Sequence, residues 1–434
     1  MPNDRAEPSR TPGAAPAAPL PVLSRAVLAL VLASLVSSCA LLGGDDDEAD
    51  ARPAPASAGA PDVAGAVTRT LDRRASAVLA GDRARFRAGL ARGPRFRAAQ
   101  DTYLANLAQL PLADLRYRVD PASLVRDGDA YWAVVEVHLQ LEGYDAVPVV
   151  SRDRYLFRPD PRRPTRLRLA SVTDAGWEAA HGVREQPWDR GRIVVRAGTG
   201  VLGIFDEGSQ PAAAALLGSV ERGIAAVAAR VPYPWSRSVV VYALSDPGFL
   251  RSLPDLPGGD ADGVDGVAFP VLASPGDPTL AATRLALHPR LLDRSGAARD
   301  RLLRHELTHV ALGARDDGAP VWLSEGIAEY VSVQPMPPEE RWLAGPAIDA
   351  ARAGVTRLPA DESFNGPGSA ANYGLSWWAC EYLARTFDAS VLFGLLDATA
   401  ARQTAPGEVL EGLLGITEGQ VARRTARLIR TTYG

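Results

Sequence analysis

The sequence contains no lysine, so all 47 of its strongly basic side chains are arginines. Asp and Glu number 51, and the formal net charge is -4, with both signs mixed along the chain. No basic patch or stripe of the kind that attracts a phosphate backbone stands out. We therefore expect no nucleic-acid partner, and we expect the chain to act as a monomer.

Cysteine is nearly absent as well, since the chain holds only Cys39 and Cys380. The two could form one disulfide, but the position of Cys39 favours another use, which would leave Cys380 without a partner. Cys380 stands in an apolar stretch after Trp377 and Trp378. A buried, inert thiol is the usual state of such a cysteine.

The N-terminal region lacks an apolar run long enough to cross a membrane. The run from Ala26 to Val36 follows Arg25 and is shorter than the roughly 20 residues that a spanning helix needs. A short apolar run behind a positive residue is typical of an export signal. The run ends in Val36-Ser37-Ser38-Cys39, which resembles the bacterial lipobox, whose cysteine is lipidated and becomes the new N-terminus.

This resemblance implies a signal peptide over residues 1–39, a lipid on Cys39 and a location on the outer face of the cell membrane. Residues 40–62 are acidic and then rich in Ala, Pro, Ser and Gly, a composition that predicts a disordered tether. The alternatives are a signal peptide that contains a cysteine by chance, or an uncleaved anchor.

The remaining residues have the composition of a globular protein, with 47% apolar and 23% charged residues in a chain of 434. Over residues 63–110 the apolar positions recur at helical spacing, among them Leu71, Ala75, Val78 and Leu79. Strands are predicted at 131–139, 147–157 and 166–173. Helices followed by antiparallel strands predict an α+β unit, and the order of elements resembles the cone-shaped fold of nuclear transport factor 2 (NTF2). We expect an NTF2-like accessory domain at 63–186.

A second domain is expected at 187–434, after a junction at Gln186-Pro187-Trp188-Asp189. The pattern predicts strands and one helix first, and almost only helices from Ser295 onward. This order fits a zincin-like catalytic domain, with a small mixed sheet and a mostly helical C-terminal part. The predicted elements are strands at 192–196, 239–244, 267–272 and 284–287 and a helix at 212–231.

The chemistry is concentrated in His305-Glu306-Leu307-Thr308-His309. We predict a helix from about Gly296 to Leu312, with Ser295 and Gly313 as its caps. His305 and His309 are four residues apart and project from one face, so both imidazoles can reach one zinc ion. Glu306 can then act as general base on a water bound to that ion.

A catalytic zinc site needs a third protein ligand. Pro320 is placed to open a second helix, which carries Glu325 and Glu329 on one face at i and i+4. Gly326, which a helix interior normally avoids, would let the two helices approach closely. The spacing alone leaves open which of the two carboxylates is the ligand.

The strings HELTH and WLSEGIAEY together resemble the helix pair of the gluzincin metallopeptidases, the thermolysin and aminopeptidase N groups. The resemblance implies that Glu325 is the third ligand of one zinc per chain, and that Glu329 holds His305 in its tautomer from the outer shell of the site. It also implies hydrolysis of peptide or protein substrates. The reverse assignment, with Glu329 as the ligand and Glu325 as support, stays open.

The chain departs from these families in three ways. Fifteen residues separate His309 from Glu325, so the interhelical loop must be tight. The exopeptidase motif is absent, and Val267-Ala268-Phe269-Pro270, the expected edge strand, has no carboxylate to grip a free N-terminus. This favours an endopeptidase. No histidine follows His309, so an oxyanion donor must come from elsewhere, with Tyr373 as first candidate and Tyr330 as second.

Three other interpretations compete with a zinc peptidase. The motif could be a surface helix that matches by coincidence. The chain could be a degenerate zincin fold that binds peptide or cell-wall material without cutting it, although an intact Glu306 argues against this. It could also be an envelope assembly factor that works through the N-terminal domain.

Overall fold

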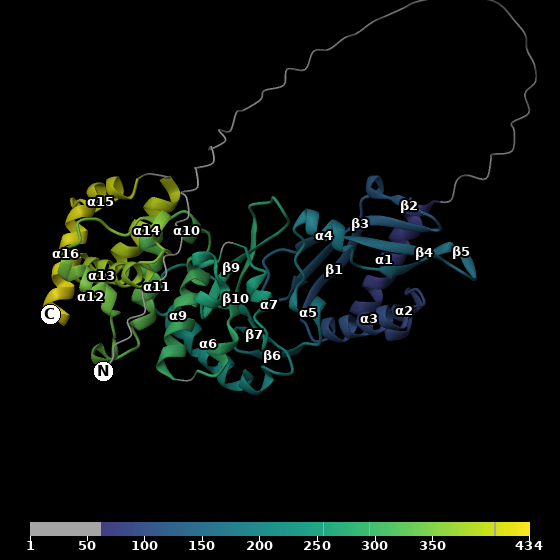
Figure 1. Cartoon of the computed structure of the whole chain (residues 1–434), viewed down its shortest axis with the longest axis horizontal. Coiled ribbons are helices and arrows are strands. Elements are labelled where there is room, and N and C mark those ends of the chain that lie inside the picture. Colours follow the sequence, from purple (N-terminus) through teal and green to yellow (C-terminus); the bar gives the residue numbers. More distant parts are fainter. Residues whose placement is uncertain (1–61, 255, 295, 403–404) are drawn as a thin grey trace, which may run out of the picture. The chain divides into compact units, whose positions relative to one another are not determined.

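The computed structural model of the chain describes residues 62–254, 256–294, 296–402 and 405–434. The expected signal peptide, Cys39 and the tether up to residue 61 lie outside these residues, as does Ser295. The predicted α+β class is confirmed. The chain forms helices and two sheets, and each sheet is built from its own part of the sequence (Figure 1).

The N-terminal part begins with three helices and continues with an antiparallel sheet, as predicted. Asp62 starts the first helix by accepting a hydrogen bond from the backbone N–H of Gly65. Leu71, Ala75 and Val78 are buried, whereas Leu79 was wrongly placed on the apolar face and is 54% exposed. It is the last residue of its helix and is turned about 100° from Val78. The elements are α1 (Val63–Leu79), α2 (Arg83–Ala88), α3 (Pro94–Leu107), β1 (Leu112–Val119), β2 (Val125–Asp127), β3 (Ala130–Leu141), β4 (Val149–Asp160) and β5 (Arg163–Ser171).

The strands of this first sheet lie in the order β1-β3-β4-β5, and β2 pairs with β3. All of these pairings are antiparallel. Helix α1 packs against β1 and β5. Two short helices, α4 (Ala175–His181) and α5 (Pro187–Arg190), lead to the second sheet.

The second sheet is mixed and has the order β6-β7-β8-β10-β9. Strands β7, β8 and β10 are parallel, and β9 runs antiparallel to β10 at the edge. The edge position expected for Val267–Pro270 is thus confirmed. A central strand, β7, was not predicted, although all five of its residues are buried. The strands are β6 (Val194–Gly198), β7 (Val201–Phe205), β8 (Val239–Ala243), β9 (Gly266–Leu272) and β10 (Leu280–Leu287).

The described residues after Ser295 form helices joined by loops, as predicted. The remaining helices are α6 (Ala213–Ala228), α7 (Gly248–Arg251), α8 (Pro289–Leu292), α9 (Ala297–Leu312), α10 (Ala314–Asp317), α11 (Val321–Val333), α12 (Gly345–Ala353), α13 (Ser369–Phe387), α14 (Ser390–Arg402), α15 (Pro406–Leu414) and α16 (Glu418–Tyr433). Of these, α6 matches the helix predicted at 212–231. By length and composition alone, Gln210–Ala228 could cross a membrane. However, α6 packs against α9, and Leu216, Val220 and Val227 are buried in the core.

The two sheets share one hydrophobic core. Side chains of the first sheet, such as Val135 and Phe157, belong to the same buried cluster as Tyr242 and Ala286 of the second sheet. Trp188 of the expected junction is also buried in this cluster. The described residues accordingly belong to one compact unit.

Polar contacts reinforce this shared core. Arg284 of β10 forms an ion pair of 2.7 Å with Asp145, from the turn between β3 and β4, and both side chains are almost fully buried. In addition, the N–H of Ala146 donates to the carbonyl of Ala281, and that of Val150 donates to Ala273. The hairpin of β9 and β10 is therefore held from the first sheet.

Candidate metal centre

Helices α9 and α11 pack against each other and bring three potential metal ligands together. His305 Nε2 and His309 Nε2 are 3.2 Å apart. Glu325 Oε2 lies 3.2 Å from the former and 3.5 Å from the latter. It is buried and makes no hydrogen bond. The three atoms face one another, as they would around a shared cation.

Glycine, rather than the expected Ser295, occupies the N-cap of α9. Gly296 holds this position with φ of 79°, a conformation that favours glycine. Gly313 ends the helix, as predicted, with φ of 60°, and its N–H donates to the carbonyl of His309. Both ends of α9, the helix that carries the two histidines, are therefore fixed by backbone geometry.

A carboxylate lies behind each imidazole, and it is hydrogen-bonded to the ring in His309 but not in His305. Glu329 Oε1 lies 3.5 Å from His305 Nδ1, and Asp316 Oδ2 lies 2.9 Å from His309 Nδ1. A proton on Nδ1 leaves the Nε2 lone pair free for a metal. Glu329 thus lies behind the group of three, on the side expected of an orienting residue, whereas Glu325 lies within it.

Asp316 was not predicted from the sequence as a residue of the site. It lies in α10, in the tight loop between the two motif helices, where no periodic pattern marks it. Arg301 was missed too, although it stands one turn before His305 and donates to Glu329 Oε2 at 2.6 Å. The sequence shows only that Asp316 and Arg301 stand close to the histidine motif.

The charged groups of this cluster shift one another's pKa values. Burial acts to lower the pKa of His309, but Asp316 and Glu325 outweigh it, so that this pKa lies well above its usual value. Burial acts to raise the pKa of Glu325, but His309 and His305 reverse this and hold it far below normal. The neighbouring carboxylates therefore stabilise a positive charge, which can be a proton on one imidazole or a cation between the two rings.

Glu306 lies on the same helix and points toward β9. Its Oε2 accepts a hydrogen bond of 2.7 Å from the N–H of Ala268. Burial raises the pKa of Glu306, and the neighbouring His305 and His309 act against this rise. A carboxylate with a raised pKa beside a metal group suits proton transfer.

Of the two candidate oxyanion donors, only Tyr373 lines the cleft described below. Its ring centre is 6.2 Å from that of His305, and its hydroxyl donates to Asn365 Oδ1 at 3.3 Å. Burial, and then the charges of Glu325 and Glu306, raise the pKa of Tyr373, so the hydroxyl stays protonated. Tyr330 instead packs against the helical core.

Gly326 does allow a close helix contact, but with a different partner from the one expected. A Cβ at this position would lie 2.6 Å from the carbonyl oxygen of Ser376 and 2.7 Å from Cys380 Sγ, both in α13. The expectation that it serves the contact with α9 was wrong, because the nearest atoms to such a Cβ belong to α13. Cys380 is buried and forms no disulfide within the described residues.

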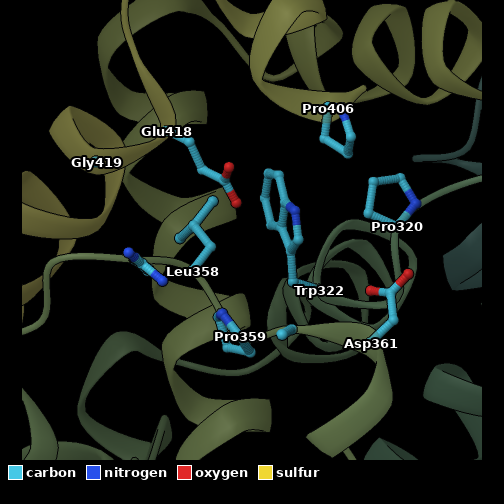
Figure 2. Close-up of a pocket in the computed structure, with 10 residues that line it drawn as sticks. Pro320, Trp322, Leu358, Pro359, Asp361, Pro406, Glu418 and Gly419 are labelled. Carbon is cyan, nitrogen blue, oxygen red and sulfur yellow. The ribbon is translucent and has the colours of Figure 1, made fainter. Parts of the chain in front are cut away.

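The metal group opens into a cleft of about 990 Å³. Its walls come from the loop Pro257–Gly263, the start of β9, one face of α9, α11, the segment 336–342 and α13. A smaller hollow of about 340 Å³ lies at the start of α11, where Trp322 is surrounded by Pro320, Pro359 and Pro406 (Figure 2). Histidine and cysteine are absent from the lining of this hollow, so the large cleft is the candidate site.

No protein-family model matches the chain, and no curated protein matches it. The assignment of chemistry therefore depends on the geometry of the site.

Proposed function

We propose that the protein is an exported, membrane-tethered, zinc-dependent endopeptidase of the gluzincin type. The observation that supports this is the group of His305, His309 and Glu325 with Glu306 beside it in a large cleft. The lipobox at Cys39 supports the tether.

The separations of the three atoms fit zinc. Ligand atoms about 2.0–2.1 Å from a tetrahedral ion are about 3.3–3.4 Å from one another. The observed separations of 3.2, 3.2 and 3.5 Å bracket this value. Two imidazoles and one carboxylate also leave a fourth position free, which is typical of catalytic rather than structural zinc sites.

Zinc bound here would supply a water of lowered pKa and polarise the substrate carbonyl. Glu306 would take a proton from that water and pass it to the leaving amine, with Oε2 steadied by Ala268. Tyr373 would donate a hydrogen bond to the oxygen that gains negative charge. Asp316 and Glu329 would keep the two imidazoles in the ligating tautomer.

The arrangement of the sheets supports the expected domain folds. A mixed sheet with the antiparallel edge strand β9, followed by helices, fits the element order expected of a zincin-like domain. An antiparallel sheet packed against the first helices fits an NTF2-like cone. The proposal includes both assignments.

A binding protein without activity is the second candidate. It would have no use for the carboxylate of Glu306 beside the three potential ligands, because binding alone requires no proton transfer. The buried position of Glu306, 6% exposed and turned to the cleft, therefore favours hydrolysis.

Metal content and peptide hydrolysis test the proposal together. The chain, purified without chelator, is analysed by plasma mass spectrometry beside Glu325→Ala and Glu329→Ala, and casein hydrolysis is compared with that of Glu306→Gln. We expect one zinc per chain, lost in Glu325→Ala and weakened in Glu329→Ala, and hydrolysis that Glu306→Gln abolishes without losing zinc. A wild-type chain that cannot be loaded with zinc would overturn the proposal.

A further inference from the structure

A group of arginines lies on the N-terminal part of the chain, where α1 packs against α2 and β5 (Figure 1). Arg73 and Arg74 belong to α1, Arg85 belongs to α2 and Arg166 belongs to β5. These four residues are called the arginine cluster below. They stand in three separate stretches of the sequence, so no run of basic residues marks them.

Three members of the cluster line one small recess, namely Arg73, Arg74 and Arg85. Arg73 donates to Thr70 Oγ1 at 3.0 Å, and Thr70 in turn donates to the carbonyl of Leu167 in β5 at 3.0 Å. The recess has a volume of about 10 Å³, which is room for about one oxygen-sized atom. A ligand would therefore place one atom in the recess and lie mostly outside it.

The positive charge of the cluster is not neutralised by ion pairs. Among the described residues, none of its members forms a salt bridge, whereas arginines close by in sequence do. Arg69 pairs with Asp62, and Arg87 pairs with Asp101. Arg74 is only 7% exposed, and its Nη1 is buried without a hydrogen-bond partner. The charges of the cluster are therefore available to an anion from outside.

The arginines of this region also repel one another. Burial lowers the pKa of Arg73, and the charges of three neighbouring arginines lower it further. These are Arg166, Arg69 and Arg85, while Asp72 acts in the opposite direction. Like charges that lie close together cost free energy in the free protein. A bound anion offsets this cost, which is a reason for the cluster to bind one.

The cluster lies beside the residue at which the described chain begins. Asp62, directly before α1, pairs with Arg69 at 3.3 Å, and Arg69 is one helical turn before Arg73. Residues 40–61 separate Asp62 from Cys39. Since an extended chain advances at most about 3.5 Å per residue, Asp62 can lie no more than about 80 Å from a lipid on Cys39. A tether of this length keeps the cluster within reach of the membrane surface.

We propose that the arginine cluster is a membrane-binding site for the phosphate headgroup of an anionic phospholipid. One phosphate oxygen lies in the recess, Arg73 and Arg85 pair with the headgroup, and Arg166 adds positive charge beside it. Guanidinium groups suit this role because their paired donors match phosphate oxygens. The proposal rests on the proposed membrane tether and is independent of hydrolysis.

A headgroup fits the observations better than a nucleic acid does. The chain as a whole has a formal net charge of -4, so a long polyanion would be repelled by the rest of the surface. A headgroup needs a single small site, and the recess with its three arginines is of that size.

The test uses the full chain with Cys39→Ser, which cannot be lipidated, in sedimentation with vesicles. One kind of vesicle contains phosphatidylglycerol and phosphatidylcholine, and the other contains phosphatidylcholine alone. We expect binding to the anionic vesicles only. An arginine near an anionic membrane surface contributes about fivefold to the partition coefficient, so Arg85→Gln combined with Arg166→Gln should lower it about 25-fold. Both side chains are exposed, and circular dichroism checks that the variant is folded.

The matched control is Arg423→Gln combined with Arg427→Gln, which removes the same charge from two exposed arginines one turn apart in α16. It should stay within about twofold of the unsubstituted arginines. An equal loss in both pairs, or equal binding to both kinds of vesicle, would overturn the proposal. Tighter binding to a DNA duplex than to the anionic vesicles would overturn the assignment to lipid.

The mass of the N-terminal peptide of the wild type shows separately whether Cys39 carries a lipid. A chain that has no lipid but binds anionic vesicles through the cluster would refute the tether and leave the site in place. A lipidated chain whose Cys39→Ser form ignores anionic vesicles would refute the site and leave the tether in place.

Discussion

Asp316 gives the sharpest test of how the site is organised. It is the carboxylate 2.9 Å from His309 Nδ1, and it was not visible as a site residue in the sequence. Replacing it with Ala removes the acceptor that fixes the tautomer of His309. Asp317, the next residue in α10, is exposed and makes no contact with either histidine, so Asp317→Ala is a matched control.

The expected loss follows from the contact. A hydrogen bond to a charged group contributes about 1.5–3 kcal/mol. Loss of an outer-shell partner of a zinc-bound imidazole typically weakens metal binding 10- to 100-fold, or about 1.4–2.8 kcal/mol. The two ranges agree, so Asp316→Ala should raise the Kd for zinc by one to two orders of magnitude. Asp316→Asn, which keeps an acceptor oxygen without the charge, should fall between Asp316→Ala and the wild type.

Competition with a chromophoric chelator at pH 7.5 measures these constants, and circular dichroism checks that each variant is folded. Asp317→Ala should stay within about twofold of the wild type. A folded Asp316→Ala that binds zinc as tightly as the wild type would refute the proposed role of the carboxylate. An equal loss in Asp317→Ala would show a general effect of charge instead.

Two further predictions concern stability. Gly326→Ala should lower the free energy of unfolding by about 1–3 kcal/mol, because the added Cβ would meet the backbone of α13. Gly345→Ala is the control and should be neutral or slightly stabilising, because a Cβ there would meet nothing within 4 Å. Urea titration measures both variants, and equal effects would contradict the packing argument. Burial raises the pKa of Asp153 to about 7, so the folded state holds this proton more tightly than the unfolded state, and stability should fall as pH rises from about 4 to 7. Since this carboxyl is partly exposed, Asp153→Asn should gain no more than about 2 kcal/mol at pH 8 and nothing at pH 4 in paired urea titrations, and an equal gain at both pH values would contradict the assignment.

The sequence was sufficient to predict which residues lie on the same face of one helix. His305 and His309, or Glu325 and Glu329, are separated by one helical turn, and helix geometry alone places each pair on one face. The meeting of the two helices was suggested by the motif pair and not by the periodicity. The strands were found where β-branched residues form a run, as in Val239–Ala243.

What the sequence did not predict depends on contacts between distant segments. Strand β7 contains Gly203 and is short, and its five buried residues are explained by its place between β6 and β8. Asp316 stands in a short connecting segment, where its position follows from the packing of α10. Gly326 was recognised as a packing residue, but the face it presents could not be assigned without knowing where α13 lies.

The core shared by the two sheets limits what can be learned by cutting the chain. Removal of residues 63–185 would strip the cover from Tyr242 and Ala286 and leave Arg284 buried without its counter-ion. Inactivity of such a fragment would then reflect lost packing and would not show which sheet carries the proposed activity. Likewise, loss of the proposed activity in an Asp145 variant would reflect the unpaired Arg284 and not a role of Asp145 in the site. The two sheets belong to one compact unit, so single substitutions in the intact chain are the sound way to separate their roles.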